Sequence, residues 1–345
     1  MRAAVYHGAN DVRIEEVPEP RPPLRGEVLI EVTRAAICGT DAAEYASGPH
    51  LIPPGTSLVL GHEFTGTVVA AGDDADGLRT GMRVVPGAGM WCGECEACRS
   101  GRTNLCRSYY TLGLQADGGL AEYALAPSRM CVPVPDACAD EAAAMAQPLA
   151  VALHALRRGR VEAGESVLVL GVGGIGAFVV AAAKARGATP LIAADVRAER
   201  LATARRLGAD AAVNSASCDL VASVRELTDG DGAALVVEAT GRDGAAATAA
   251  ACARRGGRVV TLGLPTTAQQ LELTRLTLAE VDLVASVAHV CRVDLPDAVE
   301  MLADGELARV VLDRVIPLDA LVAEGLEPLA AGAVDGKVLV APAAG

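Results

Sequence analysis

Lysine and long apolar runs are scarce in this sequence, and their scarcity excludes several classes of partner. Lysine occurs only at Lys184 and Lys337, and 30 Lys and Arg residues stand against 43 Asp and Glu residues, which gives a net charge of −13. Nucleic acids and anionic membranes are bound by clustered Lys and Arg, and the sequence has no such cluster. Gly, Arg or Asp interrupts every apolar run well short of the ~20 residues of a membrane span. We therefore expect no nucleic-acid or membrane partner. Met1 leads directly into strand-like residues without a signal peptide, so we expect a cytoplasmic protein.

Aromatic residues are also few, whereas cysteine is frequent. Two Phe and one Trp argue against a large aromatic ligand pocket. Ten cysteines would suggest disulfides in a small secreted protein, but in a chain of 345 residues without a signal peptide they favour metal binding or catalysis. Four of them fall within fifteen residues, and Cys38 precedes Gly-Thr-Asp. We interpret the other five as buried apolar residues: Cys131, Cys138, Cys218, Cys252 and Cys291.

Residues 165–195 have the pattern of a dinucleotide-binding unit. An apolar run at 166–170 stops at Gly171, Gly173 and Gly176, which fit G-x-G-x-x-G, and residues 177–186 follow as a predicted helix. The first Gly makes the tight turn, the second lets the backbone approach a pyrophosphate, and the third lets the helix pack close to the strand. The helix N-terminus faces the phosphates. Cofactor contacts in this turn are expected from Gly171, Gly173, Gly174, Ile175 and Gly176.

An acidic residue at the end of the second predicted strand bears on the choice between NAD and NADP. Asp195 lies about 20 residues past the glycine turn, where a carboxylate binds both ribose hydroxyls and repels a 2′-phosphate, so the pattern favours NAD. Arg197 is the contrary indication, because an Arg here can bind a 2′-phosphate; we expect it to stack on adenine or face solvent. Further cofactor contacts are expected at Arg200 and at the ends of later strands, namely Thr240, Leu262, Gly263, Leu264, Ser286 and Val287.

The distribution of apolar runs predicts two domains. Up to about residue 125, frequent Gly and Pro separate the short runs typical of a partly closed β-barrel. From about residue 151, strand-like runs alternate with helical stretches, as in a parallel doubly wound sheet. The tail resumes the earlier pattern, with a predicted helix at 294–307 and strands at 310–316 and 337–340. We therefore predict a two-domain α/β protein with residues 1–150 and 290–345 in one domain and 151–289 in the other.

Four cysteines form a compact cluster. Their spacing, C-x2-C-x2-C-x7-C, suits a closed tetrahedral zinc site, and glycines at 93 and 101 let the loop turn. A ferredoxin-type iron–sulfur site would need a final gap of three residues and a following Pro, whereas Arg107 follows here. Four free thiols without a metal are the remaining alternative. We expect a structural zinc in a lobe at about residues 86–110, held by Cys92, Cys95, Cys98 and Cys106.

Three short motifs could together form a second metal site. A single Cys or His at a strand end is more often a packed core residue than a ligand. A thiolate, an imidazole and a third polar group from separate segments are nevertheless what a catalytic zinc with one open position requires. Pro148 is expected to keep Gln147 extended at a helix entrance. The motifs are Cys38-Gly-Thr-Asp, Gly61-His-Glu and Gln147-Pro.

Taken together, these motifs resemble the zinc-dependent medium-chain dehydrogenases, in the branch of sorbitol, butanediol and threonine dehydrogenases. The resemblance runs nearly end to end and also rests on Gly118-Gly-Leu-Ala-Glu-Tyr, Gln147-Pro-Leu-Ala-Val-Ala-Leu-His and Gly336-Lys-Val-Leu-Val. It implies a GroES-like β-barrel catalytic domain built from both chain ends and a Rossmann NAD-binding domain inserted between them. It further implies two zinc ions per subunit and a homodimer or homotetramer.

Carried onto this sequence, the resemblance implies that Cys38 and His62 bind the catalytic zinc, with Glu63 as a direct or switching ligand. Thr40 would take the substrate proton. The chain has Gln147 where the branch usually has Glu, and Ala43 where some alcohol dehydrogenases have a His that completes the proton relay. A neutral amide leaves the metal site more positive. We hypothesise that Glu63 coordinates at least part of the time, while Gln147 ligates through its carbonyl oxygen or holds the zinc-bound water.

The implied activity is the reversible oxidation of a secondary alcohol to a ketone with hydride transfer to NAD. The small-molecule substrate would be a diol, polyol, cyclitol or hydroxy-amino acid, for which Tyr45 and His50 offer polar contacts. One alternative is a zinc-free reductase of the same superfamily, against which Cys38 and His62 argue. The other is a catalytically silent dinucleotide-binding protein. His154 is expected to have a structural role.

Overall fold

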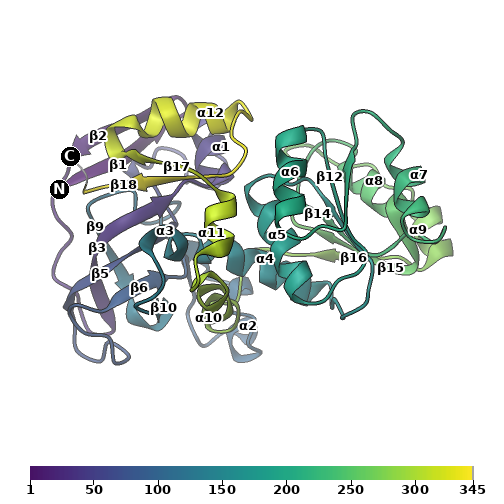
Figure 1. Cartoon of the computed structure of the whole chain (residues 1–345). Coiled ribbons are helices and arrows are strands. Elements are labelled where there is room, and N and C mark those ends of the chain that lie inside the picture. Colours follow the sequence, from purple (N-terminus) through teal and green to yellow (C-terminus); the bar gives the residue numbers. More distant parts are fainter. Residues whose placement is uncertain (344–345) are drawn as a thin grey trace. The chain divides into compact units, whose positions relative to one another are not determined.

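The computed structural model describes residues 1–343, and the chain divides into two compact units. One unit comprises Met1–Ala150 and Val290–Gly345, and the other comprises Val151–His289. Figure 1 shows strands predominating in the first unit and alternating helices and strands in the second. The chain therefore leaves the first unit once and returns to it near the C-terminus.

The first unit is organised around β3 (Glu27–Ala36). This strand pairs antiparallel with β5 (Glu63–Ala71), β9 (Tyr123–Pro127) and β18 (Lys337–Ala341), so segments from both ends of the chain meet on it. Alternate residues of β3, including Val28, Ile30 and Val32, are fully buried, as expected for a strand with one face on the core. The same sheet also contains β6 (Arg83–Pro86), β10 (Cys131–Pro133) and β17 (Leu312–Pro317).

Smaller strand pairs and short helices complete the first unit. β1 (Arg2–Gly8) pairs with β2 (Asp11–Glu16) and β4 (Leu58–Val59), and β7 (Gly89–Met90) pairs with β8 (Tyr110–Thr111). The α-helices that begin in this unit are α1 (Gly39–Ser47), α2 (Glu96–Arg99), α3 (Asp140–Ala143), α4 (Ala146–Arg158), α10 (Cys291–Leu302), α11 (Glu306–Val311) and α12 (Glu327–Ala330). The short helical turns are η1 (Thr103–Leu105), η2 (Ser128–Met130), η3 (Leu318–Ala320) and η4 (Leu321–Leu326).

The predicted helix at 294–307 is two helices, α10 and α11. The chain breaks between them at Gly305, whose φ of 72° lies in the left-handed region that glycine adopts without strain. Because α11 continues to Val311, the following strand starts at Leu312 and not at 310 as predicted.

The second unit is a six-stranded parallel sheet with helices on both faces. The strand order is β13-β12-β11-β14-β15-β16, so the direction of winding reverses between β11 and β14. In such a sheet, ligands bind outside the carboxyl ends of the strands at this reversal. The strands are β11 (Val167–Leu170), β12 (Leu191–Asp195), β13 (Ala211–Asn214), β14 (Ala233–Glu238), β15 (Ala253–Thr261) and β16 (Asp282–Ala285). Sequence reasoning missed β13, because this half-buried segment, AAVN, has too few strand formers to stand out.

Helices cover both faces of this sheet in Figure 1, with α5 (Gly174–Ala185) and α6 (Ala198–Arg206) on one face and α7 (Leu220–Glu226) and α8 (Ala245–Cys252) on the other. The helix α9 (Leu273–Ala279) also belongs to this unit. Every residue of β11 and β12 is buried, which explains why these strands are continuous apolar runs. Ile192 and Val236 share one core cluster with Val224 of α7.

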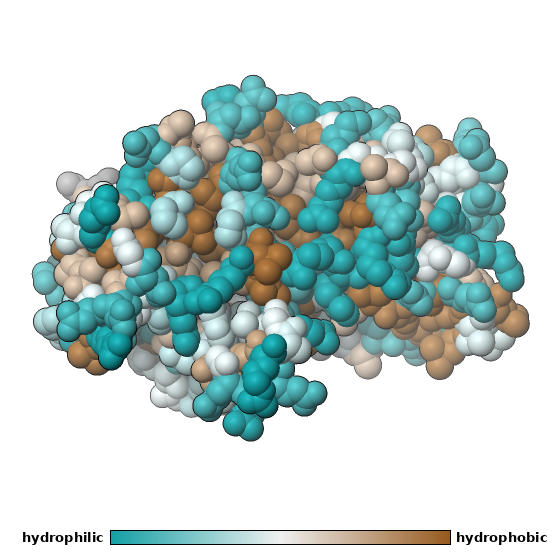
Figure 2. Space-filling view, turned by 90° about the horizontal axis from the view of Figure 1, so that it is seen from below, coloured by the Kyte–Doolittle hydropathy of each residue, from teal (hydrophilic) through white to brown (hydrophobic). Residues whose placement is uncertain are grey.

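Hydrophilic side chains, in teal, cover much of the face shown in Figure 2, with hydrophobic ones exposed between them. Within residues 1–343, no helix combines the length and apolarity needed to cross a membrane. The prediction that the five scattered cysteines are buried is wrong for Cys218, which is exposed, and Cys131 is only partly buried. Cys218 lies in the turn between β13 and α7, where its thiol donates to the Asn214 carbonyl oxygen at 3.2 Å.

Candidate functional site

The glycine turn connects β11 to α5 in the second unit. Gly171 has a φ of 91°, which favours glycine. A Cβ on Gly176 would lie only 1.8 Å from the Gly171 carbonyl oxygen, so glycine is required for α5 to pack this close. Among the described residues, a Cβ on Gly173 would meet one atom within 4 Å, Arg200 Nη1 at 3.8 Å. The backbone at Gly173 is therefore open to a ligand, and Gly174 and Ile175 begin the helix beside it.

Asp195 joins the end of β12 to this turn. Its buried carboxylate accepts hydrogen bonds from the backbone N–H groups of Val172 at 2.7 Å, Val196 at 2.8 Å and Arg197 at 3.0 Å. An ionised carboxylate offers about four acceptor positions, so about one remains for a ribose hydroxyl rather than two. Sequence reasoning missed this structural role. Arg200 Nη1 lies 3.9 Å from Asp195 Oδ2, and Arg197 Nε lies 3.9 Å from Glu199 Oε2.

The ends of β14, β15 and β16 lie at the same edge of the sheet as the glycine turn. Glu238 Oε1 accepts the N–H groups of Thr240 at 2.6 Å and Gly241 at 3.0 Å, which fixes the turn after β14. A Cβ on Gly263 would lie 2.1 Å from the Gly241 nitrogen, so the two loops are in close contact. Leu262 and Ser286 are buried, whereas Leu264 and Val287 are exposed. The parallel sheet thus brings the predicted cofactor residues to one edge.

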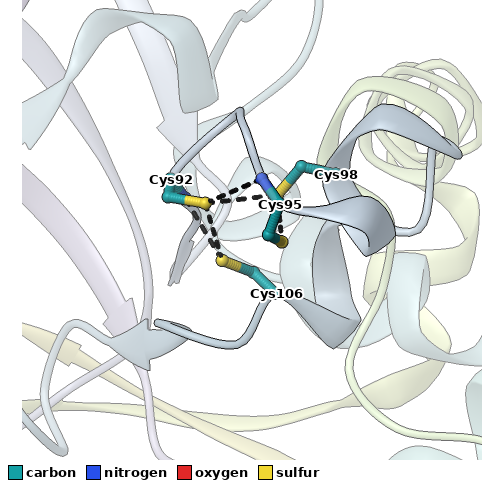
Figure 3. Close-up of side chains that lie close together, drawn as sticks. All are labelled: Cys92, Cys95, Cys98 and Cys106. Atoms are coloured by element: carbon teal, nitrogen blue, oxygen red, sulfur yellow. Dashed lines mark hydrogen bonds between the residues drawn. The ribbon is translucent and has the colours of Figure 1, made fainter.

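The four clustered cysteines converge in the first unit. Figure 3 shows their side chains pointing toward one another from the loop around α2 and η1. The Sγ–Sγ distances are 3.5 Å for Cys95–Cys98, 3.5 Å for Cys92–Cys106 and 4.0 Å for Cys92–Cys98. A tetrahedral zinc with Zn–S bonds of about 2.3 Å requires sulfur–sulfur separations of about 3.8 Å. The four residues therefore fit a closed zinc site.

Backbone N–H groups make this cluster suited to thiolates. Hydrogen bonds from the Arg107 and Cys98 N–H groups lower the pKa of Cys95 to about 6, and those from Glu94 and Cys95 lower the pKa of Cys92. Burial raises the pKa of the neighbouring Cys98 to about 12. Four thiolates at these separations repel one another, so a cation is needed to hold all of them charged.

Cys38, His62 and Glu63 form the second cluster. Ala36 of β3 pairs with Glu63 of β5, so the residues that follow β3 lie beside those that precede β5. One potential ligand atom from each of the three residues lies within 4.8 Å of the others. His62 and Glu63 are buried, and Cys38 is partly buried. Sulfur, imidazole nitrogen and carboxylate oxygen are the ligand types that zinc takes, so this donor set also fits zinc.

Asp41 supports both Cys38 and His62. It is fully buried, its Oδ2 accepts the Cys38 N–H at 2.9 Å, and its Oδ1 lies 3.4 Å from His62 Nδ1. The facing carboxylate leaves His62 Nε2 as the nitrogen available to a metal. Burial alone would lower the pKa of His62, but the charges of Asp41 and Cys38 outweigh it and raise that pKa well above its ordinary value. The cluster thus favours a positive charge at its centre.

Lys337 is a residue that sequence reasoning used only as a family marker. Its buried ammonium group, on β18, forms an ion pair with Glu63 and donates to the Ile37 carbonyl oxygen at 2.8 Å. Burial lowers the pKa of Lys337, but the charges of Glu63 and Cys38 outweigh it and raise that pKa. The available signal was its rarity, because this lysine directly precedes an apolar run in a chain that has one other lysine.

The remaining predicted site residues have mixed outcomes. Thr40 lies in the first turn of α1, partly buried, two residues after Cys38. Gln147 is buried but helical, so the predicted extended conformation is wrong. The helix α4 begins at Ala146, and Pro148 lies in its first turn, where a backbone N–H would have no intrahelical acceptor.

The Tyr45 hydroxyl donates to Glu327 Oε1 at 3.1 Å, so its polar group is already engaged. His154 lies within hydrogen-bonding distance of Arg157 on the same helix, and its expected structural role stays a prediction.

Two family models match the chain: "Alcohol dehydrogenase GroES-like domain" over residues 24–136 and "Zinc-binding dehydrogenase" over residues 174–304. A sorbitol dehydrogenase of Bombyx mori is 36% identical, covering 82% of this chain and 83% of its own. A sorbitol dehydrogenase of Bacillus subtilis is 32% identical, covering 88% and 86%. The chain belongs to the zinc-type medium-chain dehydrogenases, in their sorbitol and butanediol dehydrogenase branch.

Solved structures agree with this assignment. The 2R,3R-butanediol dehydrogenase of Bacillus subtilis has a TM-score of 0.90 at 30% identity, covering 99% of both chains. A dehydrogenase of Sinorhizobium meliloti 1021 bound to NADP has a TM-score of 0.90 at 29% identity and the same coverage. An alcohol dehydrogenase of Escherichia coli CFT073 complexed with NADH has a TM-score of 0.89 at 28% identity, again covering 99% of both chains. The predicted GroES-like and Rossmann fold is confirmed.

The glycine turn leads to a prediction that separates packing from ligand access. We expect Gly176→Ala to lower the free energy of unfolding by about 1–3 kcal/mol, because the new Cβ overlaps the Gly171 carbonyl oxygen. Gly173→Ala is the control, and its new Cβ has room. The control should unfold like the wild type and yet bind the dinucleotide more weakly. Denaturant unfolding and fluorescence titration with NADH measure the two effects, and equal stabilities for the two variants would contradict this account.

The cysteine cluster predicts a zinc that supports folding. Replacing Cys106 by Ser should remove about one zinc ion per chain and lower the unfolding temperature by roughly 5–10 °C, because structural zinc contributes directly to folding. Metal analysis and calorimetry provide the measurements. Cys218→Ser, at an exposed thiol outside the cluster, serves as the control and should change neither value. An unaltered zinc content in the Cys106 variant would rule out the site.

Proposed function

We propose that this oxidoreductase is an NAD-dependent, cytoplasmic zinc dehydrogenase that reversibly oxidises a secondary alcohol of the diol, polyol, cyclitol or hydroxy-amino acid class to a ketone. The observation that carries the proposal is the convergence of Cys38, His62 and Glu63 at the adjoining ends of two paired strands. The names of its relatives, sorbitol dehydrogenase and butanediol dehydrogenase, support a substrate with several hydroxyl groups. The ten cysteines are free thiols, which suits the reducing cytoplasm.

In the proposed mechanism, Cys38 and His62 would hold a zinc ion that would supply Lewis-acid activation of the substrate hydroxyl, and the glycine turn would hold a nicotinamide dinucleotide that would supply the hydride acceptor. The chain supplies the alignment and the proton path. Cys38 and His62 hold the metal, and Asp41 fixes both by accepting the Cys38 N–H and facing His62 Nδ1. Thr40, two residues after Cys38 in the first turn of α1, accepts the substrate proton and passes it outward.

We further propose that Glu63 alternates between Lys337 and the metal. The buried ion pair with Lys337 supports this, because it gives the carboxylate a second cationic partner when it does not coordinate. Gln147 is neutral, so the charge that Glu63 adds or withdraws sets the net charge at the metal. Gln147 completes the site through its carbonyl oxygen or by holding a water.

NAD is the proposed cofactor because Asp195 presents a buried carboxylate where NADP would place a 2′-phosphate. Arg197, the contrary indication, has Glu199 Oε2 at 3.9 Å, which partly offsets its charge. The two cofactor-bearing structures of similar fold hold NADP in one case and NADH in the other. The proposal therefore rests on this chain's own residues, with Gly171–Gly176 and Arg200 cradling the pyrophosphate.

The deciding experiment is an absorbance screen of diols, polyols, cyclitols and hydroxy-amino acids with NAD and with NADP. We expect turnover with a polyol or diol and NAD, and a loss of roughly a thousand-fold or more in kcat/KM on Cys38→Ser, because a zinc site contributes several kcal/mol. This variant should keep the zinc of the cysteine lobe and still bind NADH, which provides the internal control. Turnover that persists with zinc only in the lobe would refute the proposal.

We also propose a homodimer or homotetramer assembled through the nucleotide-binding sheet. β16 is an edge strand, and Leu283 on it is exposed, as are Leu273 and Leu278 of α9. Edge strands with exposed apolar residues pair readily with another copy.

Replacing Leu283 by Lys should therefore lower the mass measured by light scattering toward that of one chain. Leu24→Lys is the matched control, since Leu24 is also an exposed leucine but lies in the first unit. An assembly that survives the Leu283 change and dissociates with the Leu24 change would place the interface elsewhere.

A further inference from the structure

A buried carboxylate outside the metal clusters holds the loop that follows α1. Glu44 is fully buried, and its Oε2 accepts the His50 N–H at 2.9 Å. Its Oε1 accepts the Leu51 N–H at 2.5 Å and lies 3.4 Å from the Ile52 nitrogen. Hydrogen bonds to an ionised acceptor are stronger than those between neutral groups. The charge of Glu44 is therefore stabilised by the backbone of residues 48–52, which we call the substrate loop.

Gly48 lets the substrate loop approach Glu44 closely. A Cβ at this position would lie 2.5 Å from the Glu44 carbonyl oxygen, 2.6 Å from Glu44 Oε2 and 2.7 Å from the Tyr6 hydroxyl. Its φ of −62° is open to any residue, so the requirement for glycine is purely one of space. The first residue of the loop is thus packed against the carboxylate that binds the next ones.

The other side of the substrate loop is tied to the segment beside His62. Gln115 Nε2 donates to the Leu51 carbonyl oxygen at 2.7 Å, and its Oε1 accepts the Thr111 N–H at 2.8 Å. This segment contacts the residue before His62, because the Gly119 N–H donates to the Gly61 carbonyl oxygen at 2.8 Å. The loop is therefore connected to both ligand-bearing segments, to Cys38 through α1 and to His62 through the Gln115 segment.

The substrate loop exposes two side chains of opposite character. His50 and Leu51 are exposed, whereas Ile52 is buried and anchors the loop. The His50 ring is oriented by Ser47, whose hydroxyl lies 2.9 Å from Nε2. α1 has nine residues, and a helix of that length spans only about 13 Å. The loop therefore begins about one helix length from Cys38.

We propose that Glu44 is a positioning residue that fixes the substrate loop so that His50 and Leu51 bind the part of the substrate remote from the reacting carbon. The inference rests on the proposed function and makes its substrate class more specific. His50 hydrogen-bonds a second hydroxyl group and Leu51 contacts the carbon chain, so the preferred substrates are alcohols that carry further hydroxyl groups.

The test is Glu44→Gln in the zinc-loaded, full-length enzyme. Glutamine keeps the shape, but it turns an NH₂ group toward a backbone N–H and leaves a single acceptor oxygen. We expect the KM for a polyol to rise about ten-fold or more, while kcat stays within about two-fold of the wild-type value. This pattern is expected because the lost contacts bind the substrate equally in the ground state and in the transition state. KM for 2-propanol, which has no second hydroxyl, should stay within about two-fold. The zinc content should not change.

Three variants separate positioning from general stability. Asp294→Asn alters another buried carboxylate of the same unit, whose Oδ2 accepts the Val290 N–H at 2.7 Å, and should lower stability without changing the ratio of the two KM values. Tyr6→Phe removes a buried hydroxyl that has no hydrogen-bond partner within residues 1–343, and should also leave the ratio unchanged. Glu44→Asp keeps the charge on a shorter side chain and should partly restore the polyol KM.

The outcomes are distinguishable. A polyol KM unaltered by Glu44→Gln, with zinc retained, overturns the inference. An equal loss of kcat for both alcohols accompanied by zinc loss also overturns it, because Glu44 would then support only α1. If the wild-type enzyme oxidises no alcohol with either cofactor, the proposed function fails. Hydrogen exchange of residues 48–52 in the Glu44→Gln variant then decides separately whether Glu44 holds the loop, and unaltered exchange would refute that contact.

Discussion

The pairing of β3 with β5 is the constraint on which the cluster of Cys38, His62 and Glu63 depends. Their register places Ala36 opposite Glu63, so Cys38 and His62 come together although each belongs to a different segment. Because side chains alternate along a strand, a shift of one residue would turn Glu63 to the opposite face and separate the three side chains. The alternating buried residues of β3, Val28, Ile30 and Val32, resist such a shift, so the core of the first unit fixes the geometry of the site.

Buried carboxylates recur wherever a loop must be held near a site. Asp41 binds the start of α1, Glu44 binds the loop after it, Asp195 binds the glycine turn, and Glu238 binds the turn after β14. Each accepts backbone N–H groups, which stabilise its charge where water is excluded. Part of the acidic excess of this chain therefore has a structural use, and Glu63 is instead paired with a buried lysine.

Sequence reasoning succeeded where the chemistry requires a particular residue type. The spacing of the cysteines predicted that four thiols lie together, as they do in the structure. The spacing of the glycines predicted the turn between β11 and α5, and the alternation of strands and helices predicted the parallel sheet. It failed where tertiary context decides. β13 is short and rich in alanine, the start of α4 includes Gln147 despite Pro148, and Gly305 divides a continuous apolar pattern into two helices. The partner of Glu63 could not be deduced, because Lys337 is separated from it by most of the chain.

The position of β18 has a consequence for synthesis on the ribosome. Residues 151–289 are contiguous, so the nucleotide-binding unit can fold as soon as it emerges. The first unit has to wait, because β18 pairs with β3 and carries the lysine that neutralises Glu63. The nascent N-terminal segment thus leaves the part of the β3 edge that β18 covers unpaired, and leaves the Glu63 carboxylate without its lysine partner, until β18 has been synthesised.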